Sequence, residues 1–151
     1  MRIEATLADK GITLPAAPMP AANYVPFVQA GNLIFVSGQI SADDSGPITG
    51  KLGDGTSVED GAAAARRCGL ALIAQLKAAV GDLDRVTRVV KLTGFVNSTP
   101  DFTDQPKVIN GCSDLMVEVF GDAGRHSRAA VSAASLPFGV AVEIEAIFEV
   151  A

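Results

Sequence analysis

The stretch HSRAAVSAASLPFGVAVEIEA, residues 126–146, holds the side chains whose types and spacing could do chemistry. It opens with His126 and Arg128, and its second half carries Glu143 and Glu145. A guanidinium is a planar fork of N–H donors that fits a carboxylate or phosphate, and the small residues after Arg128 leave room for one. The pattern predicts a hairpin of two strands. Two interpretations follow: Arg128 forms an internal ion pair with Glu143 or Glu145, or it anchors an anionic ligand.

Other kinds of site are not supported by the residues present. One histidine and two separated cysteines cannot supply a zinc tetrad, so we expect no metal site. Cys68 and Cys112 fall in apolar helical patterns and are expected in the core. The sequence has no G-x-S-x-G motif of a serine nucleophile, and the loop GKLGDGT lacks the spacing of a phosphate-binding loop. We expect no bound cofactor.

Composition narrows the class of protein. A chain of 151 residues with 48% hydrophobic content suits one compact domain. A net charge of −5 and a pI near 4.7 disfavour nucleic acid as a partner, because phosphates require a basic surface. No apolar run is long enough to span a membrane, and the N-terminal MRIEATLADKG has no apolar signal-peptide core. We therefore expect a cytoplasmic protein without a membrane partner.

Periodicity predicts the elements that must position the candidate residues. Residues 1–11 predict a short helix that Gly11 ends, and prolines make the following segment an extended arm. Two strands then flank a turn at Gly31–Asn32, and the apolar run Leu33–Val36 is expected to be covered on both faces. A short strand is expected near Ile48–Leu52.

Two amphipathic helices follow, with a β-branched strand at 85–98 between them. The first is expected to begin after a capping serine, Ser57, and to end near Val80; the second covers 108–120 and stops at Gly121. Two helices can cover only one face of the sheet. The last strand alternates an apolar face with a half-polar one, so the uncovered face predicts an interface between copies of the chain.

Two segments together resemble a known family. GNLIFVSGQI (31–40) and SRAAVSAASLPFGVAVEIEAIFEV (127–150) are similar to the RidA/YjgF family of reactive intermediate imine deaminases, also described as endoribonuclease L-PSP. The likeness covers about residues 23–150, and the stretch 94–128 resembles a longer-chain subgroup. The chain thus divides into an N-terminal helix and arm, residues 1–22, and a RidA/YjgF-like domain, residues 23–151.

The resemblance implies a chorismate-mutase-like α+β fold, a mixed β-sheet with two helices on one face. It also implies a homotrimer with a central barrel and sites between subunits. In this likeness Arg128 grips the substrate carboxylate and Glu143 is associated with the catalytic water. The residues implied to line the cleft are Ser37, Gly38, Asn110 and Ala130.

Three positions depart from the family pattern or stay open. Phe27 occupies the place of a common tyrosine and cannot donate a hydrogen bond, although it would still line the substrate site. Tyr24 lies three residues earlier and, with the period of a strand, should face the other way. His126 either borders the cleft as a titratable group or lies in a solvated loop.

The implied activity is hydrolysis of small 2-imino acids to 2-keto acids and ammonia, without metal or cofactor. An imine needs little activation once its carboxylate is fixed and water is held at the imine carbon. One alternative is a trimeric module that binds small acids without turnover. A second is an endoribonuclease, which the acidic charge and the single histidine disfavour.

Overall fold

The computed structural model describes residues 2–20 and 22–151, so the predictions for Met1 and Ala21 lie outside the described residues. The elements, in chain order, are α1 (Ile3–Asp9), β1 (Phe27–Ala30), β2 (Leu33–Ile40), β3 (Ala42–Asp43), β4 (Gly46–Pro47), α2 (Val58–Val80), η1 (Leu83–Arg85), β5 (Val86–Asn97), α3 (Gln105–Phe120), η2 (Gly121–Gly124), β6 (Ser127–Ala133), η3 (Pro137–Gly139) and β7 (Val142–Val150).

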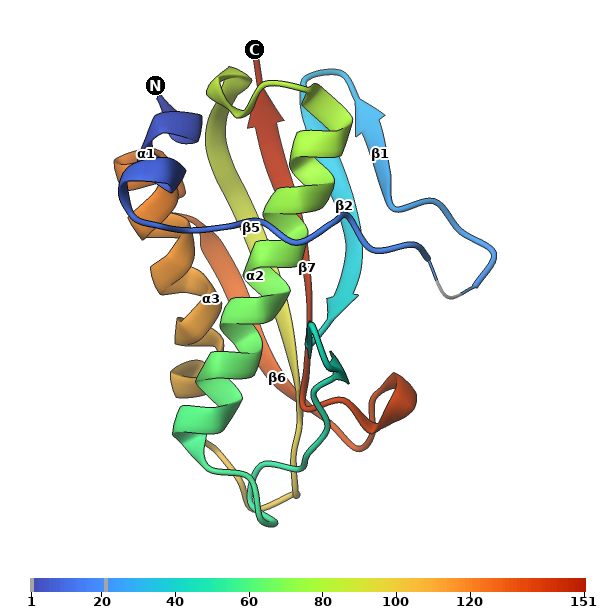
Figure 1. Ribbon diagram of the computed structural model, residues 1–151. Coiled ribbons are helices and arrows are strands. Elements are labelled where there is room, and N and C mark those ends of the chain that lie inside the picture. The colour runs from blue at the N-terminus through green and yellow to red at the C-terminus, as the bar shows by residue number, and fades with distance from the viewer. Residues whose placement is uncertain (1, 21) are drawn as a thin grey trace.

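Five strands form one mixed sheet in the order β1-β2-β7-β5-β6, and β3 pairs with β4 in a separate ribbon. The pair β5 and β6 is parallel, whereas the other neighbours are antiparallel. Helices α2 and α3 lie side by side across one face of the sheet (Figure 1). This is the α+β arrangement of a mixed sheet with two helices on one face that the sequence predicts.

The predicted hairpin of residues 126–146 is wrong. Strand β5 lies between β6 and β7, and β6 runs parallel to β5 at the edge of the sheet. A parallel pair needs a crossover connection, and α3 provides it between β5 and β6. The segment after β6 then crosses the end of β5, so β7 enters the centre of the sheet.

Local sequence signals explain where the helices begin and end. The Ser57 side chain accepts a hydrogen bond from the backbone N–H of Asp60 and caps α2, as predicted. Helix α3 ends at Gly121, whose φ of 62° suits a residue without a Cβ atom. Both helices bury an apolar stripe against the sheet, which includes the two cysteines as expected.

The β1–β2 hairpin turns at Gly31–Asn32, as predicted, with Ala30 opposite Leu33. The expectation that Leu33–Val36 is covered on both faces is wrong for the single chain. Ile34 and Val36 are buried toward the helices, but Phe35 is 40% exposed because no element of the described chain covers that face. The strand expected near 48–52 forms only isolated bridges, at Thr49 and Leu52.

Glycines allow the layers to approach closely. A Cβ atom at Gly111 on α3 would collide with the backbone of Ala62 on α2, so the two helices touch through their main chains there. A Cβ atom at Gly94 on β5 would collide with the Ile109 side chain. These contacts hold α3 against both α2 and the sheet, and α3 in turn carries part of the candidate site.

Helix α1 packs at one end of the helical layer, with Ile3 and Leu7 buried and the Asp84 carboxylate accepting a hydrogen bond from the Ile3 N–H at 2.6 Å. The arm, defined here as residues 11–20 and 22–26, then crosses over α2 to reach β1 (Figure 1). None of the helices in the described ranges is both long and apolar enough to cross a membrane.

Changing Gly111 to Ala should destabilise the fold, although Gly→Ala in an exposed helix normally adds up to about 1 kcal/mol. The added methyl group meets backbone atoms that cannot rotate away, so we expect a loss of about 2 kcal/mol or more in the free energy of unfolding. Urea denaturation measures this loss. The exposed neighbour Asn110→Ala serves as control, with a change within about 0.5 kcal/mol. A Gly111→Ala protein as stable as wild type would contradict the packing described.

Candidate functional site

Arg128 lies on the helix-covered side of the edge strand β6. It is registered opposite Leu92, which is fully buried, and its guanidinium reaches α3. Nη1 donates to Ser113 Oγ at 3.1 Å, and Nη2 donates to the Pro106 carbonyl at 3.2 Å. A guanidinium has five N–H donors, so this side chain is held in place and still has donors for an anionic ligand.

The predicted ion pair between Arg128 and Glu143 or Glu145 is wrong within the chain. Among the described residues, the salt bridges pair other groups, such as Arg66 with Glu118 at 3.0 Å. The cause is the strand order, because β5 separates β6 from β7. Arg128 therefore carries its charge with hydrogen-bond partners that are neutral.

His126 belongs to the same cluster rather than to a solvated loop. Its Nδ1 lies 2.6 Å from the Gly124 carbonyl and its Nε2 lies 2.8 Å from Ser113 Oγ. A carbonyl only accepts, so Nδ1 carries the proton and neutral Nε2 accepts from the Ser113 hydroxyl. That hydroxyl oxygen in turn accepts from Arg128. Ser113 thus connects the histidine to the arginine.

Burial lowers the pKa of His126, and the nearby Arg128 charge lowers it further, against the opposing effect of the Gly124 hydrogen bond. These effects favour the neutral histidine, in which Nε2 accepts the hydrogen bond from the Ser113 hydroxyl. Asn110 lies on the same side of α3, one turn from Pro106 and three residues before Ser113, and it is exposed. Ala130 is opposite Gly94 and packs against the core beside this cluster.

Glu143 lies on the opposite side of the sheet from Arg128. Its neighbours along β7, Val142 and Ile144, point into the core, so alternation places Glu143 on the open face. It is registered with Phe95 on one side and Ile40 on the other. Within one chain, the two residues implied to act on substrate do not meet.

Gly38 leaves the space that the Glu143 carboxylate occupies. A Cβ atom at Gly38 would collide with Glu143 Oε2. The register of β2 against β7 shifts between Val36 and Gln39, and this irregularity brings Gly38 across the carboxylate. Burial raises the pKa of Glu143, and the charge of Glu145 raises it further.

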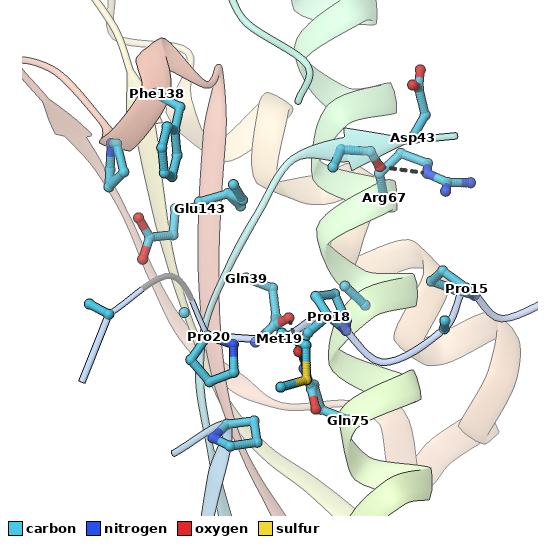
Figure 2. A pocket seen from close by; sticks show the side chains of 18 of the residues that line it. Pro15, Pro18, Met19, Pro20, Gln39, Asp43, Arg67, Gln75, Phe138 and Glu143 are labelled. Atoms are coloured by element: carbon cyan, nitrogen blue, oxygen red, sulfur yellow. Dashed lines mark hydrogen bonds between the residues drawn. The ribbon is translucent and has the colours of Figure 1, made fainter. Parts of the chain in front are cut away.

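A cavity of about 590 Å³ opens beside Glu143 and Gly38. It runs around the edge of β2, where the short strand β1 pairs only with the first half of β2 and the arm passes over the remainder. Figure 2 shows Pro18, Met19 and Pro20 of the arm between Glu143 and Gln75 of α2. This cavity could not be predicted from the sequence, because no spacing pattern reveals where an extended arm lies.

Buried amides fix the arm on α2. Gln75 Nε2 donates to the Pro18 carbonyl at 2.6 Å and lies 3.4 Å from Gln39 Oε1. Gln39 Nε2 donates to the Ser37 carbonyl at 2.9 Å, and Ser37 Oγ donates to the Val25 carbonyl at 2.8 Å. Ser37 thus lies next to Gly38 and ties β2 to the end of the arm.

Phe27 and Tyr24 have different surroundings in the structure. Phe27 packs against the core and is not among the residues that line the cavity. Tyr24 precedes β1 and lines the cavity. Tyr24 and Glu143 therefore line the same cavity.

Comparison with known proteins identifies the family. The profile of a family described as "YjgF/chorismate_mutase-like, putative endoribonuclease" matches residues 4–148. The chain belongs to the RidA/YjgF family. Its fold is therefore the chorismate-mutase-like α+β fold that the two motifs imply.

Three RidA/YjgF relatives are informative. Protein TCP17 of Trypanosoma cruzi is 54% identical over 98% of this chain and 94% of its own length. The crystal structure of the Agrobacterium tumefaciens protein Atu1372, described as of unknown function, is 47% identical, with a TM-score of 0.90 over 99% of this chain and 94% of that chain. The 2-iminobutanoate/2-iminopropanoate deaminase of Mus musculus is 31% identical over 94% of this chain and 92% of its own length.

The raised pKa of Glu143 predicts a stability cost at neutral pH. A carboxyl group with a raised pKa in the folded state binds its proton more tightly there than in the unfolded state. Its contribution to stability is therefore fully present below about pH 4.5, the ordinary value, and is lost as the pH rises through the folded pKa. Glu143→Gln should raise the Tm relative to wild type at pH 7, and the difference should shrink toward pH 4.

Thermal unfolding at several pH values measures this difference. The matched control is Glu149→Gln on the same strand, which should give no gain because the Glu149 carboxylate accepts a hydrogen bond from Thr87 Oγ1 at 2.7 Å. A Glu143→Gln protein that melts below wild type at pH 7 would show that the charged carboxylate is well stabilised, contrary to its surroundings here.

Proposed function

We propose that the protein is an imine deaminase that hydrolyses small 2-imino acids to 2-keto acids and ammonia in sites shared between subunits of a homotrimer. The observation that carries the proposal is the guanidinium of Arg128, held by Ser113 and Pro106 at an open sheet edge with donors to spare. The names of the mouse and rat relatives support the same reaction.

The proposed chemistry needs two groups with different properties. Arg128 binds the substrate carboxylate through paired N–H donors, which fixes the imine carbon in one orientation. Glu143 accepts a proton from water as the oxygen attacks that carbon and passes it to the nitrogen, which gives a carbinolamine. It then transfers the remaining hydroxyl proton to the nitrogen as the C–N bond breaks and the C=O bond forms. Water supplies the carbonyl oxygen, and nitrogen leaves as ammonia. A carboxylate with a raised pKa is a better base for this step than an ordinary one.

The position of these groups on opposite sides of the sheet supports a site between two copies. Phe95 and Glu143 lie in one row across the open face with Val131, which is 44% exposed. Val28 and Phe35 on the same face are 54% and 40% exposed. A face with these apolar side chains around a carboxylate gains stability when another copy covers it. In that assembly the Glu143 of one subunit meets the Arg128 of the next.

Removing the anchor should abolish most of the activity. We expect Arg128→Ala to lower kcat/KM for 2-iminopropanoate by about 100-fold or more, because truncation of a desolvated charged partner typically costs 2–5 kcal/mol or more. The substrate is generated in situ as 2-aminoacrylate from serine, and its loss is followed over the buffer rate. The matched control is Arg125→Ala, whose exposed side chain lies 3.7 Å from Asp122 and should leave the rate within about twofold.

The same assay decides between the proposal and its alternatives. Wild-type protein that gives no acceleration over buffer would overturn deamination. Binding of 2-keto acids that depends on Arg128 but is accompanied by no turnover would favour a small-acid-binding module instead. Equal activity of the Arg128→Ala protein would remove Arg128 from the site.

A further inference from the structure

We infer that the cavity beneath the arm is a subsite for an extended apolar side chain, so that the preferred substrates are 2-imino acids with side chains longer than those of three- or four-carbon acids. The inference rests on the proposed function, because it extends the Glu143 site. It concerns the part of the ligand that neither Arg128 nor Glu143 touches.

The cavity is much larger than an imine of three carbons. The cavity measures about 590 Å³, whereas water in the liquid occupies about 30 Å³ per molecule, so it has room for about twenty waters. An imine of three carbons has only six non-hydrogen atoms. Such a ligand at Glu143 would leave most of the cavity filled with water, which a longer apolar chain would displace.

Most of the cavity lining is uncharged. The sequence from Gly11 to Ala42 contains no Asp, Glu, Lys or Arg. This segment supplies the wall that faces α2, including Pro15, Pro18 and Met19. The charged side chains, Asp43, Asp44 and Arg67, gather away from Glu143, as Figure 2 shows for Asp43 and Arg67. Apart from the amides of Gln39 and Gln75, the rest of the lining is mostly apolar.

A strained aromatic residue, Phe138, lines the cavity. Phe138 has φ 59° and ψ 13°, a left-handed conformation that is unusual for a residue other than glycine. Its ring is 66% exposed and lies next to Glu143 in Figure 2. Strained backbone of this kind concentrates at sites that bind ligands. The strain holds an apolar ring beside the carboxylate, where a substrate side chain would enter.

Buried hydrogen bonds anchor the arm to the rest of the protein. The carbonyl of Pro18 accepts its hydrogen bond from Gln75, which is 2% exposed, and Gln75 in turn contacts Gln39. These bonds place Met19 and its neighbours at a set distance from α2. A wall held by buried hydrogen bonds can discriminate ligands by length.

Binding of 2-oxo acids of increasing length tests the subsite without requiring turnover. Calorimetry measures the affinities of 2-oxopropanoate, 2-oxobutanoate and 2-oxohexanoate for the wild-type protein. Each methylene group buried should strengthen binding by about threefold to fourfold, so 2-oxohexanoate should bind at least tenfold more tightly than 2-oxopropanoate. Equal affinity for the three acids would overturn the inference.

A variant and its control test whether the chain-length preference arises in the cavity beneath the arm. Ala71→Leu adds side-chain atoms to the cavity from α2 and should reduce the ratio of long-chain to short-chain affinity to about threefold or less. The matched control is Ala63→Leu, the same change at an exposed position of the same helix, which should keep the wild-type ratio. A ratio that survives Ala71→Leu would place the chain-length preference elsewhere and overturn the inference.

Phe138→Gly gives a second variant, in case Ala71→Leu folds poorly. Glycine accepts the left-handed conformation, so the Tm should not fall, while the loss of the ring should lower the ratio severalfold. A Phe138→Gly protein with the full wild-type ratio would remove Phe138 from the subsite.

The outcomes separate this inference from the proposed function. Length-dependent binding without deamination would overturn the proposed function and support the subsite. Deamination of 2-iminopropanoate with no preference for longer chains would support the proposed function and overturn the subsite.

Discussion

The sheet itself separates the guanidinium of Arg128 from the carboxylate of Glu143, and the candidate site depends on this separation. Arg128 reaches back to α3 on the covered side, whereas Glu143 lies on the face that no element of the described chain covers. The cause is the path of the chain, since α3 returns it to a parallel edge strand and β7 then enters the centre of the sheet. A fold with β6 and β7 as a hairpin would have allowed the two charges to neutralise each other.

Each half of the site is built on rigid structure. The half around Arg128 depends on α3, whose position is set by main-chain contact with α2 at Gly111 and by contact with β5 at Gly94. The half around Glu143 depends on the shift in register at Gly38, which gives the carboxylate its space. The arm adds a wall to this second half.

Much of the fold could be predicted from the sequence because it follows from local signals. The capping Ser57, the apolar stripes of both helices and the turn at Gly31 all act over a few residues, and the structure confirms them. The order of strands could not be predicted in this way. Whether β6 pairs with β5 or with β7 depends on contacts between residues distant in sequence, so the hairpin and its ion pair were wrong.

The candidate site was predictable only where residue type itself indicates chemistry. Arg128 and Glu143 were identified from the family motifs, and their roles remain predictions. Ser113 and the cavity beneath the arm were missed, because a serine on a helix and a run of prolines and alanines have many ordinary uses.

The central claim is that Arg128 and Glu143 act together only across two copies of the chain. Arg128→Ala and Glu143→Gln chains, each expected to be nearly inactive alone, can be co-expressed with different tags and the mixed oligomers isolated. If each site takes its arginine from one subunit and its glutamate from the next, every mixed trimer, whichever variant is in excess, has both intact groups at one of its three sites. The account predicts about a third of the wild-type deaminase activity in the isolated mixed oligomers. Mixed oligomers as inactive as the separate variants would contradict it.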